Sequence, residues 1–149
     1  MPIRFTTELV LERPIAEVWR AFDDPGNMPR WQPTLESFET VSGTPGQPGA
    51  VSRLTYAEGK HQMVLVETIT ERREPGYFAG TYASGTTINR MVNRFIALDI
   101  RRTHWKIECE FVFLGVWRLL TPFLRNPIER RTRANVERFK ECLEAGRFE

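Results

Sequence analysis

The chain has 149 residues, of which 41% are hydrophobic and 27% charged, and its formal net charge is +2. These values exclude a disordered or collagen-like chain, and so small a positive charge does not indicate a nucleic-acid partner. The sequence shows neither an apolar run of membrane-spanning length nor a signal peptide, so we expect a cytoplasmic protein without stable membrane insertion. The length suits one domain over residues 1–149, with room for a core and a ligand cavity.

The first predicted elements are one strand and two short helices. Residues 3–12 are rich in strand-forming residues, and Pro14 then suits the first turn of a helix. The apolar face of this helix consists of Ile15, Val18, Trp19 and Phe22. The stretch "DDPGN" ends the helix, and "MPRWQP" leaves room for about one further turn. Helices this short are not stable alone, so they must pack on something larger.

Six further strands are predicted between about residues 35 and 114. Their segments are "LESFETVSG", "AVSRLTYAEG", "HQMVLVETITER", "YFAGTYAS", "TTINRMVNRFIAL" and "RTHWKIECEFVFL". The connections between them are short, which permits antiparallel pairing and excludes crossover helices. We therefore expect one large antiparallel sheet.

The last predicted element is a long helix that follows the apolar lead-in "VWRLLTPFLRN". Asn126 suits its N-cap, Pro127 its first position and Gly146 its end. One stripe consists of Ile128, Thr132, Asn135, Val136, Phe139 and Leu143 and should pack against the sheet. The arginine cluster at positions 125, 130, 131, 133 and 138 is either the solvated face of this helix or a surface for an anionic membrane or acidic partner.

This order of elements predicts a twisted sheet that curls around the long helix, with the two short helices at one end. The stretches "PIAEVWRAFDDPGNMPRWQP", "INRMVNRF", "HWKIECEFVF" and "RFKECLEAG" resemble the SRPBCC superfamily. That superfamily includes START lipid-transfer domains, the birch-pollen allergen group, aromatic polyketide cyclases and small bacterial polyketide-cyclase-like proteins. The resemblance implies an α+β helix-grip fold with a curved antiparallel sheet of about six or seven strands.

Strand alternation predicts which side chains face the space between sheet and helix. Arg90 and Arg94 would be costly to bury, so the opposite face of their strand should point inward. The expected ligand-binding residues are Trp31, Leu54, Tyr56, Met63, Leu65, Phe78, Tyr82, Asn89, Met91, Asn93, Phe95, Trp105, Ile107, Cys109, Phe111, Asn135 and Phe139. The three asparagines either orient a ligand or satisfy backbone groups, and Trp31 either covers the cavity mouth or plugs the core.

The strand around Glu67 is apolar on both faces near its middle, which makes its orientation ambiguous. If the face of Met63 and Leu65 points inward, Glu67 is a carboxyl group at the cavity with a raised pKa. If it does not, Glu67 is solvated near the sheet edge. Glu67, Tyr56 and Tyr82 are the candidate catalytic residues, although nothing in the sequence defines their mutual geometry.

No metal or cofactor site is expected. His61 and His104 lie far apart, no Cys-x-x-Cys or His-x-x-x-His spacing occurs, and "GTPGQPG" lacks the ending of a phosphate-binding loop. Cys109 and Cys142 are expected to be two buried thiols rather than a disulfide.

The favoured function is binding of a hydrophobic or amphipathic small molecule, such as a lipid, a polyketide or an isoprenoid-like compound, by a monomer or homodimer. The resemblance implies two alternatives. One is a polyketide cyclase or dehydratase acting in the same cavity, and the other is a protein-interaction module, because some relatives bind and stimulate a chaperone.

Overall fold

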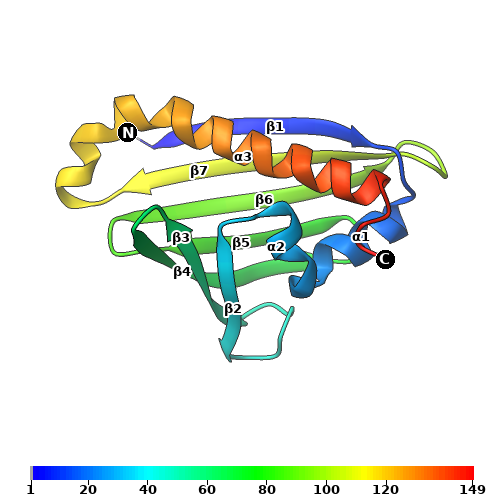
Figure 1. Ribbon diagram of the computed structural model, residues 1–149, viewed down its shortest axis with the longest axis horizontal. Helices are drawn as coiled ribbons and strands as arrows, with labels where there is room; N and C mark the ends of the chain where they lie inside the picture. Colours follow the sequence, from blue (N-terminus) through cyan, green and yellow to red (C-terminus); the bar gives the residue numbers. More distant parts are fainter. Residues whose placement is uncertain (1) are drawn as a thin grey trace.

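The computed structural model describes residues 2–149, which form a curved antiparallel sheet around a long C-terminal helix (Figure 1). Seven strands lie in the order β1-β7-β6-β5-β4-β3-β2. Strands β2 to β6 each pair with the next strand in the sequence, and β1 pairs with β7. The predicted α+β helix-grip fold is therefore confirmed.

All seven predicted strands are present. They are β1 (Ile3–Leu11), β2 (Leu35–Ser42), β3 (Val51–Glu58), β4 (His61–Arg73), β5 (Tyr77–Ala83), β6 (Thr87–Ala97) and β7 (Thr103–Phe113). The register slips by one residue at two points in β2 and between Ile69 and Glu71 in β4. Such bulges bend a strand and increase its twist, which gives the sheet its concave face. Gly80 lies opposite the bulge in β4, where an added Cβ would come within 3.0 Å of the Thr68 carbonyl oxygen.

The two short helices predicted after β1 are α1 (Ile15–Asp23) and α2 (Met28–Trp31), joined by the 3-10 turn η1 (Pro25–Asn27). The Asp24 carboxylate accepts a hydrogen bond from the Gly26 N–H at 2.8 Å, which satisfies the start of η1. The buried Asn27 amide donates to the Ala21 carbonyl at 3.0 Å and ties the turn to α1. Val18, Trp19 and Trp31 are buried, so these short helices gain their stability from packing.

The predicted start of the long helix at Asn126 and Pro127 is wrong. Helix α3 spans Thr121–Glu144, after the 3-10 segment η2 (Gly115–Leu120). Pro122 occupies the first turn, where its missing N–H costs nothing, and Pro127 lies inside the helix. Leu124 and Ile128 pack against the core, which compensates for the proline inside the helix.

The predicted end of the same helix is confirmed. Gly146 has a φ of +71° just after α3, in the left-handed region that favours glycine. The Arg147 N–H donates to the Cys142 carbonyl at 2.8 Å, and the Gly146 N–H donates to the Leu143 carbonyl at 3.1 Å. These bonds satisfy carbonyl groups that the end of the helix would leave without partners.

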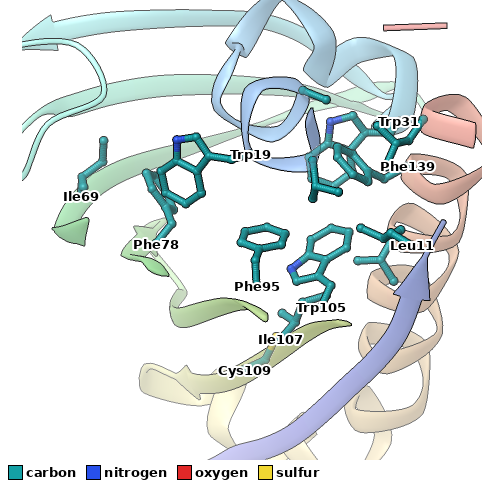
Figure 2. Close-up of a cluster of buried hydrophobic side chains, with 14 of the residues drawn as sticks. Leu11, Trp19, Trp31, Ile69, Phe78, Phe95, Trp105, Ile107, Cys109 and Phe139 are labelled. Atoms are coloured by element: carbon teal, nitrogen blue, oxygen red, sulfur yellow. The ribbon is translucent and has the colours of Figure 1, made fainter. Parts of the chain in front are cut away.

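The main core is an aromatic cluster between the sheet and helices α1, α2 and α3 (Figure 2). Trp105 lies at its centre, with ring centroids 5.1 Å from Phe139 and 5.4 Å from Phe95. Cys109 and Cys142 are buried and free, as predicted. Among residues 2–149, no helix combines the length and apolar content needed to cross a bilayer.

Candidate functional site

A large cavity lies between the concave face of the sheet and α3. Its volume is about 1100 Å³, and side chains from β2 to β7, α2, η2 and α3 line it. The aromatic cluster fills the space beside α1 and α2, so the cavity extends from there along the sheet. The two short helices therefore position the cavity as well as completing the core.

Most of the residues predicted to bind a ligand line this cavity. They are Trp31, Tyr56, Met63, Leu65, Phe78, Tyr82, Asn89, Met91, Asn93, Trp105, Ile107, Phe111 and Asn135. Trp31 is both a lining residue and part of the core, with only 8% of its surface exposed.

Four of the predicted residues lie outside the lining: Leu54, Phe95, Cys109 and Phe139. All four are buried by neighbouring side chains rather than facing open space. Phe95 and Phe139 pack on Trp105 in the aromatic cluster, and Leu54 packs with Leu35 and Tyr56. Burial raises the pKa of the Cys109 thiol to about 12. Strand alternation identified the inward face, but it does not distinguish a lining residue from one packed in the core.

Glu67, Tyr82 and Asn89 form a polar row across this otherwise apolar sheet face. Glu67 on β4 is paired with Tyr82 on β5, and Tyr82 is paired in turn with Asn89 on β6. All three line the cavity, and Glu67 is only 5% exposed. The face of Met63 and Leu65 thus points inward and carries Glu67 with it.

Burial is the main cause of the raised pKa values of Glu67 and Tyr82. It raises the pKa of the Glu67 carboxyl above its usual value, while a hydrogen bond with the Tyr82 side chain offsets part of the rise. Burial also raises the pKa of Tyr82, and the nearby Glu67 charge raises it further. The arrangement places a buried carboxyl group beside a phenol, and the raised pKa of the carboxyl favours its protonated form.

Asn89 Oδ1 and Trp31 Nε1 are buried polar atoms of lining residues and have neither a hydrogen-bond partner nor an ion-pair partner within residues 2–149. Buried polar groups are normally paired, so an unpaired acceptor and donor at a cavity are candidate ligand contacts. Asn93 differs, because its amide donates to the Phe78 carbonyl at 3.4 Å and accepts from Trp105 Nε1 at 3.1 Å. Asn93 therefore satisfies groups of the core, which is one of the two interpretations given for the asparagines.

The rim near β3 carries three polar residues that were not among the predicted site residues: Gln32, Glu58 and Arg131. The Tyr56 hydroxyl donates to Gln32 Oε1 at 2.7 Å, and burial is the main cause of the raised pKa of Tyr56. Arg131 on α3 forms an ion pair with Glu58 on β3, and its guanidinium lies 6.0 Å from the Tyr56 ring centroid. Arg131 belongs to the arginine cluster at the C-terminus, but no local signal in the sequence indicated that it reaches back to the sheet.

A second group of polar residues missed in the sequence ties the loop between β2 and β3 to α1. Arg72 Nη2 donates to Asp23 Oδ2 at 2.8 Å, and Arg72 Nη1 bonds the other oxygen of the same carboxylate. Arg72 also donates to the Gly46 carbonyl at 3.3 Å and lies 5.1 Å from the centroid of the Trp19 ring. Asp23, Gly46 and Arg72 all line one end of the cavity.

The lining reaches both ends of the sheet. At the end of α1 and α2 it includes Pro25, Met28 and the loop residues 45–47. At the opposite end it includes Glu58 and His61, which flank the turn between β3 and β4, the residues 84–86 between β5 and β6, and Trp117 of η2. These two groups lie at opposite ends of the strands, because successive turns of an antiparallel sheet alternate between one end of the strands and the other (Figure 1).

A helix-grip fold enclosing an apolar cavity with a few polar groups defines a class of proteins that share a scaffold more than a mechanism. The chain belongs to the polyketide cyclase/dehydrase and lipid transport family, whose model matches residues 2–144. No protein with a curated description matches the chain in sequence.

Solved structures support the same fold at low sequence identity. The crystal structure of Ara h 8.0201 is similar with a TM-score of 0.80 and 18% identity, covering 97% of this chain and 99% of that one. The Zhui aromatase/cyclase from a Streptomyces species has a TM-score of 0.81 and 15% identity, covering 97% and 94%. A norcoclaurine synthase point mutant from Thalictrum, in complex with a transition-state analogue, has a TM-score of 0.70 and 12% identity, covering 99% and 97%.

Proposed function

We propose that the protein binds a hydrophobic or amphipathic small molecule, such as a lipid, a polyketide or an isoprenoid-like compound, in the cavity between the sheet and α3. The observation that carries this proposal is the polar row of Glu67, Tyr82 and Asn89 within a cavity of about 1100 Å³. Typical small-molecule sites measure about 300–1,000 Å³ and combine apolar walls with a few polar groups. The size of this cavity favours a ligand with a long chain or several rings.

Apolar burial would supply most of the affinity, at roughly 25 cal/mol for each Å² removed from water. The polar row would determine the orientation. A neutral Glu67 carboxyl donates to a ligand carbonyl or hydroxyl oxygen, and Asn89 Oδ1 accepts from a ligand hydroxyl. Binding residues are thus proposed among the lining positions, with Leu54, Phe95, Cys109 and Phe139 supporting them from the core.

The first experiment is native mass spectrometry of the gently purified protein, followed by denaturing extraction and mass analysis of the released compounds. We expect a stoichiometric apolar compound, and a saturable signal when cis-parinaric acid is titrated into the stripped protein. A protein that releases no compound and shows no saturable binding of the probe contradicts the proposal.

A pair of variants on β6 separates cavity binding from surface adsorption. Met91 lines the cavity, whereas the neighbouring Val92 lies on the opposite face of the strand. Met91→Trp should fill part of the cavity and weaken cis-parinaric acid binding about tenfold, which is about 1.4 kcal/mol. Val92→Trp adds the same side chain outside and should bind the probe as the wild type does. Equal affinities in the two variants would place the probe elsewhere.

The same row supports a second candidate function, a cyclase or dehydratase reaction. A buried carboxyl with a raised pKa beside a phenol is suited to proton transfer on a poly-ketone or hydroxylated substrate. If the protein is an enzyme, the extracted compound should turn over, and Glu67→Gln should abolish turnover while binding of the compound persists. Binding without turnover in the wild type favours the carrier.

A further inference from the structure

We infer that the protein docks on anionic lipid bilayers through an exposed apolar face formed by Val116, Leu119, Leu120 and Phe123, which we term the docking face. The inference rests on the proposed function, because docking there would place one end of the ligand cavity against the lipid surface. The docking face belongs to η2 and the first turn of α3, which lie beyond the end of β7 (Figure 1).

The exposure of this segment is unusual for its composition. Every residue from Leu114 to Leu120 is exposed, and Val116, Leu119 and Phe123 are each exposed by more than three quarters, at 76%, 79% and 76%. Contiguous apolar surface of this kind is uncommon on a monomeric protein and marks a binding surface. Val116 and Leu119 lie one above the other because they are one turn of the 3-10 helix apart, and Leu120 and Phe123 continue the apolar surface into the first turn of α3.

Other apolar residues of the same segment face the cavity. Trp117 and Leu124 line the cavity, and Leu124 packs against the core. Trp117 is 44% exposed, so its ring lies at the boundary between the cavity and the docking face. Tryptophan is enriched at such boundaries in membranes because its amphipathic ring suits the headgroup region. The docking face is therefore continuous with one end of the cavity.

The charges of the segment favour an anionic lipid surface over a second copy of the chain. Between Glu110 and Glu129 the sequence has no acidic residue, whereas Arg118 and Arg125 lie within the segment and are exposed. Within residues 2–149, neither arginine forms an ion pair. A two-fold dimer through this surface would bring the arginines of both copies together without acidic partners, while anionic headgroups would neutralise them.

The experiment measures sedimentation of the full chain with vesicles of phosphatidylcholine alone and of phosphatidylcholine mixed with phosphatidylglycerol. We expect binding to the mixed vesicles that weakens as salt rises. Trp117 supplies a direct signal, because Trp19, Trp31 and Trp105 are exposed by 8% or less and should not respond. A blue shift of the emission on vesicle addition, lost in Trp117→Phe, would place the contact at this segment.

Two variants test the surface itself. The triple variant Val116→Ser, Leu119→Ser, Phe123→Ser should reduce vesicle partitioning about tenfold or more, because it removes most of the exposed apolar area. Leu98→Ser combined with Ile100→Ser is the matched control, since these residues are exposed by 46% and 83% at the opposite end of the sheet. The control variant should bind vesicles as the wild type does.

Each outcome decides the inference. Absence of wild-type binding to mixed vesicles overturns it, and so does equal loss of binding in the triple and control variants. A wild-type dimer in sedimentation velocity that becomes monomeric in the triple variant, without vesicle binding, would make this face a dimer contact instead.

Binding of cis-parinaric acid without vesicles is measured in parallel. If that binding is intact while vesicle binding fails, only the docking inference is lost. If vesicles bind and the probe does not, the proposed ligand function is lost.

Discussion

At the scale of single residues, Glu67 has the largest consequence for the chemistry of the cavity. Glu67 is only 5% exposed, and its partners on the two adjacent strands are Ser52 and Tyr82, neither of which is a cation. A buried carboxyl without a cationic partner is stabilised in its neutral form, which explains the direction of its pKa shift. The same residue is the proposed proton donor to a ligand.

The raised pKa of Glu67 predicts how stability depends on pH. The folded state holds this proton more tightly than the unfolded state, so the free energy of unfolding falls as pH rises from about the unperturbed value of 4.5 to the folded pKa. Glu67→Gln removes this pH-dependent loss of unfolding free energy, because an amide does not titrate. We therefore expect the Tm of the variant, relative to that of the wild type, to rise as the pH increases from about 4.5 to the folded pKa and to level off above it. A difference in Tm that stays constant over this range would show that the carboxyl does not titrate abnormally.

At the scale of elements, Arg72 links strand β4 to α1 and to the loop between β2 and β3. These contacts lie at one end of the cavity. Arg72 joins the three through Asp23 and the Gly46 carbonyl, and its side chain is only 12% exposed. A planar guanidinium on a single carboxylate holds its partner in one orientation. The loop is thereby held against α1.

Loss of this link should loosen the loop. Arg72→Met is expected to cost about 2 kcal/mol of unfolding free energy, because it removes charge-assisted hydrogen bonds from a largely buried site. Hydrogen exchange over residues 43–50 should accelerate. Arg73→Met is the matched control, since the Arg73 side chain is 66% exposed and turned outward. If the exchange of the loop is unchanged in Arg72→Met, the loop is held by other contacts.

At the scale of the whole molecule, the fold combines a packed aromatic end with an open end. The aromatic cluster around Trp105 and Phe139 anchors α1, α2 and α3 on the sheet, whereas the cavity leaves a large volume unfilled by side chains. Unfilled volume forgoes the dispersion contacts that close packing supplies. A ligand that fills the cavity restores those contacts and favours the folded state.

A bound ligand should therefore raise the global stability. At a free concentration of cis-parinaric acid 100 times its Kd, the gain is about 2.7 kcal/mol, or about 5 to 10 °C in Tm for a chain of this length. Differential scanning calorimetry with and without the probe measures this gain. Met91→Trp should show a smaller shift at the same probe concentration. A wild-type Tm that does not respond to the probe would contradict binding to the folded state.

The class of fold and the order of its elements could be predicted from the sequence, because both depend on local signals. The alternation along residues 87–97 and 103–113 marks the strands and their inward faces, and Gly146 marks the end of α3. The start of α3 was mispredicted because Pro127 is a strong local signal, and only packing of Leu124 and Ile128 overrides it.

The arrangement of the site could not be predicted from local patterns, because it depends on how the strands and helices pack together. Whether Glu67 faces the cavity depends on which side of β4 meets the core, and its pairing with Tyr82 depends on the register between strands. The Arg72–Asp23 and Arg131–Glu58 pairs join residues far apart in the chain, so no local pattern reveals them. Phe95 and Phe111 share one sheet face and read alike in sequence, yet one fills the core and the other lines the cavity. Trp19 and Phe22 of α1 pack on the Phe95 ring, whereas the Phe111 ring stacks on Phe5 of β1, so the difference is a property of the assembled layers and not of either strand.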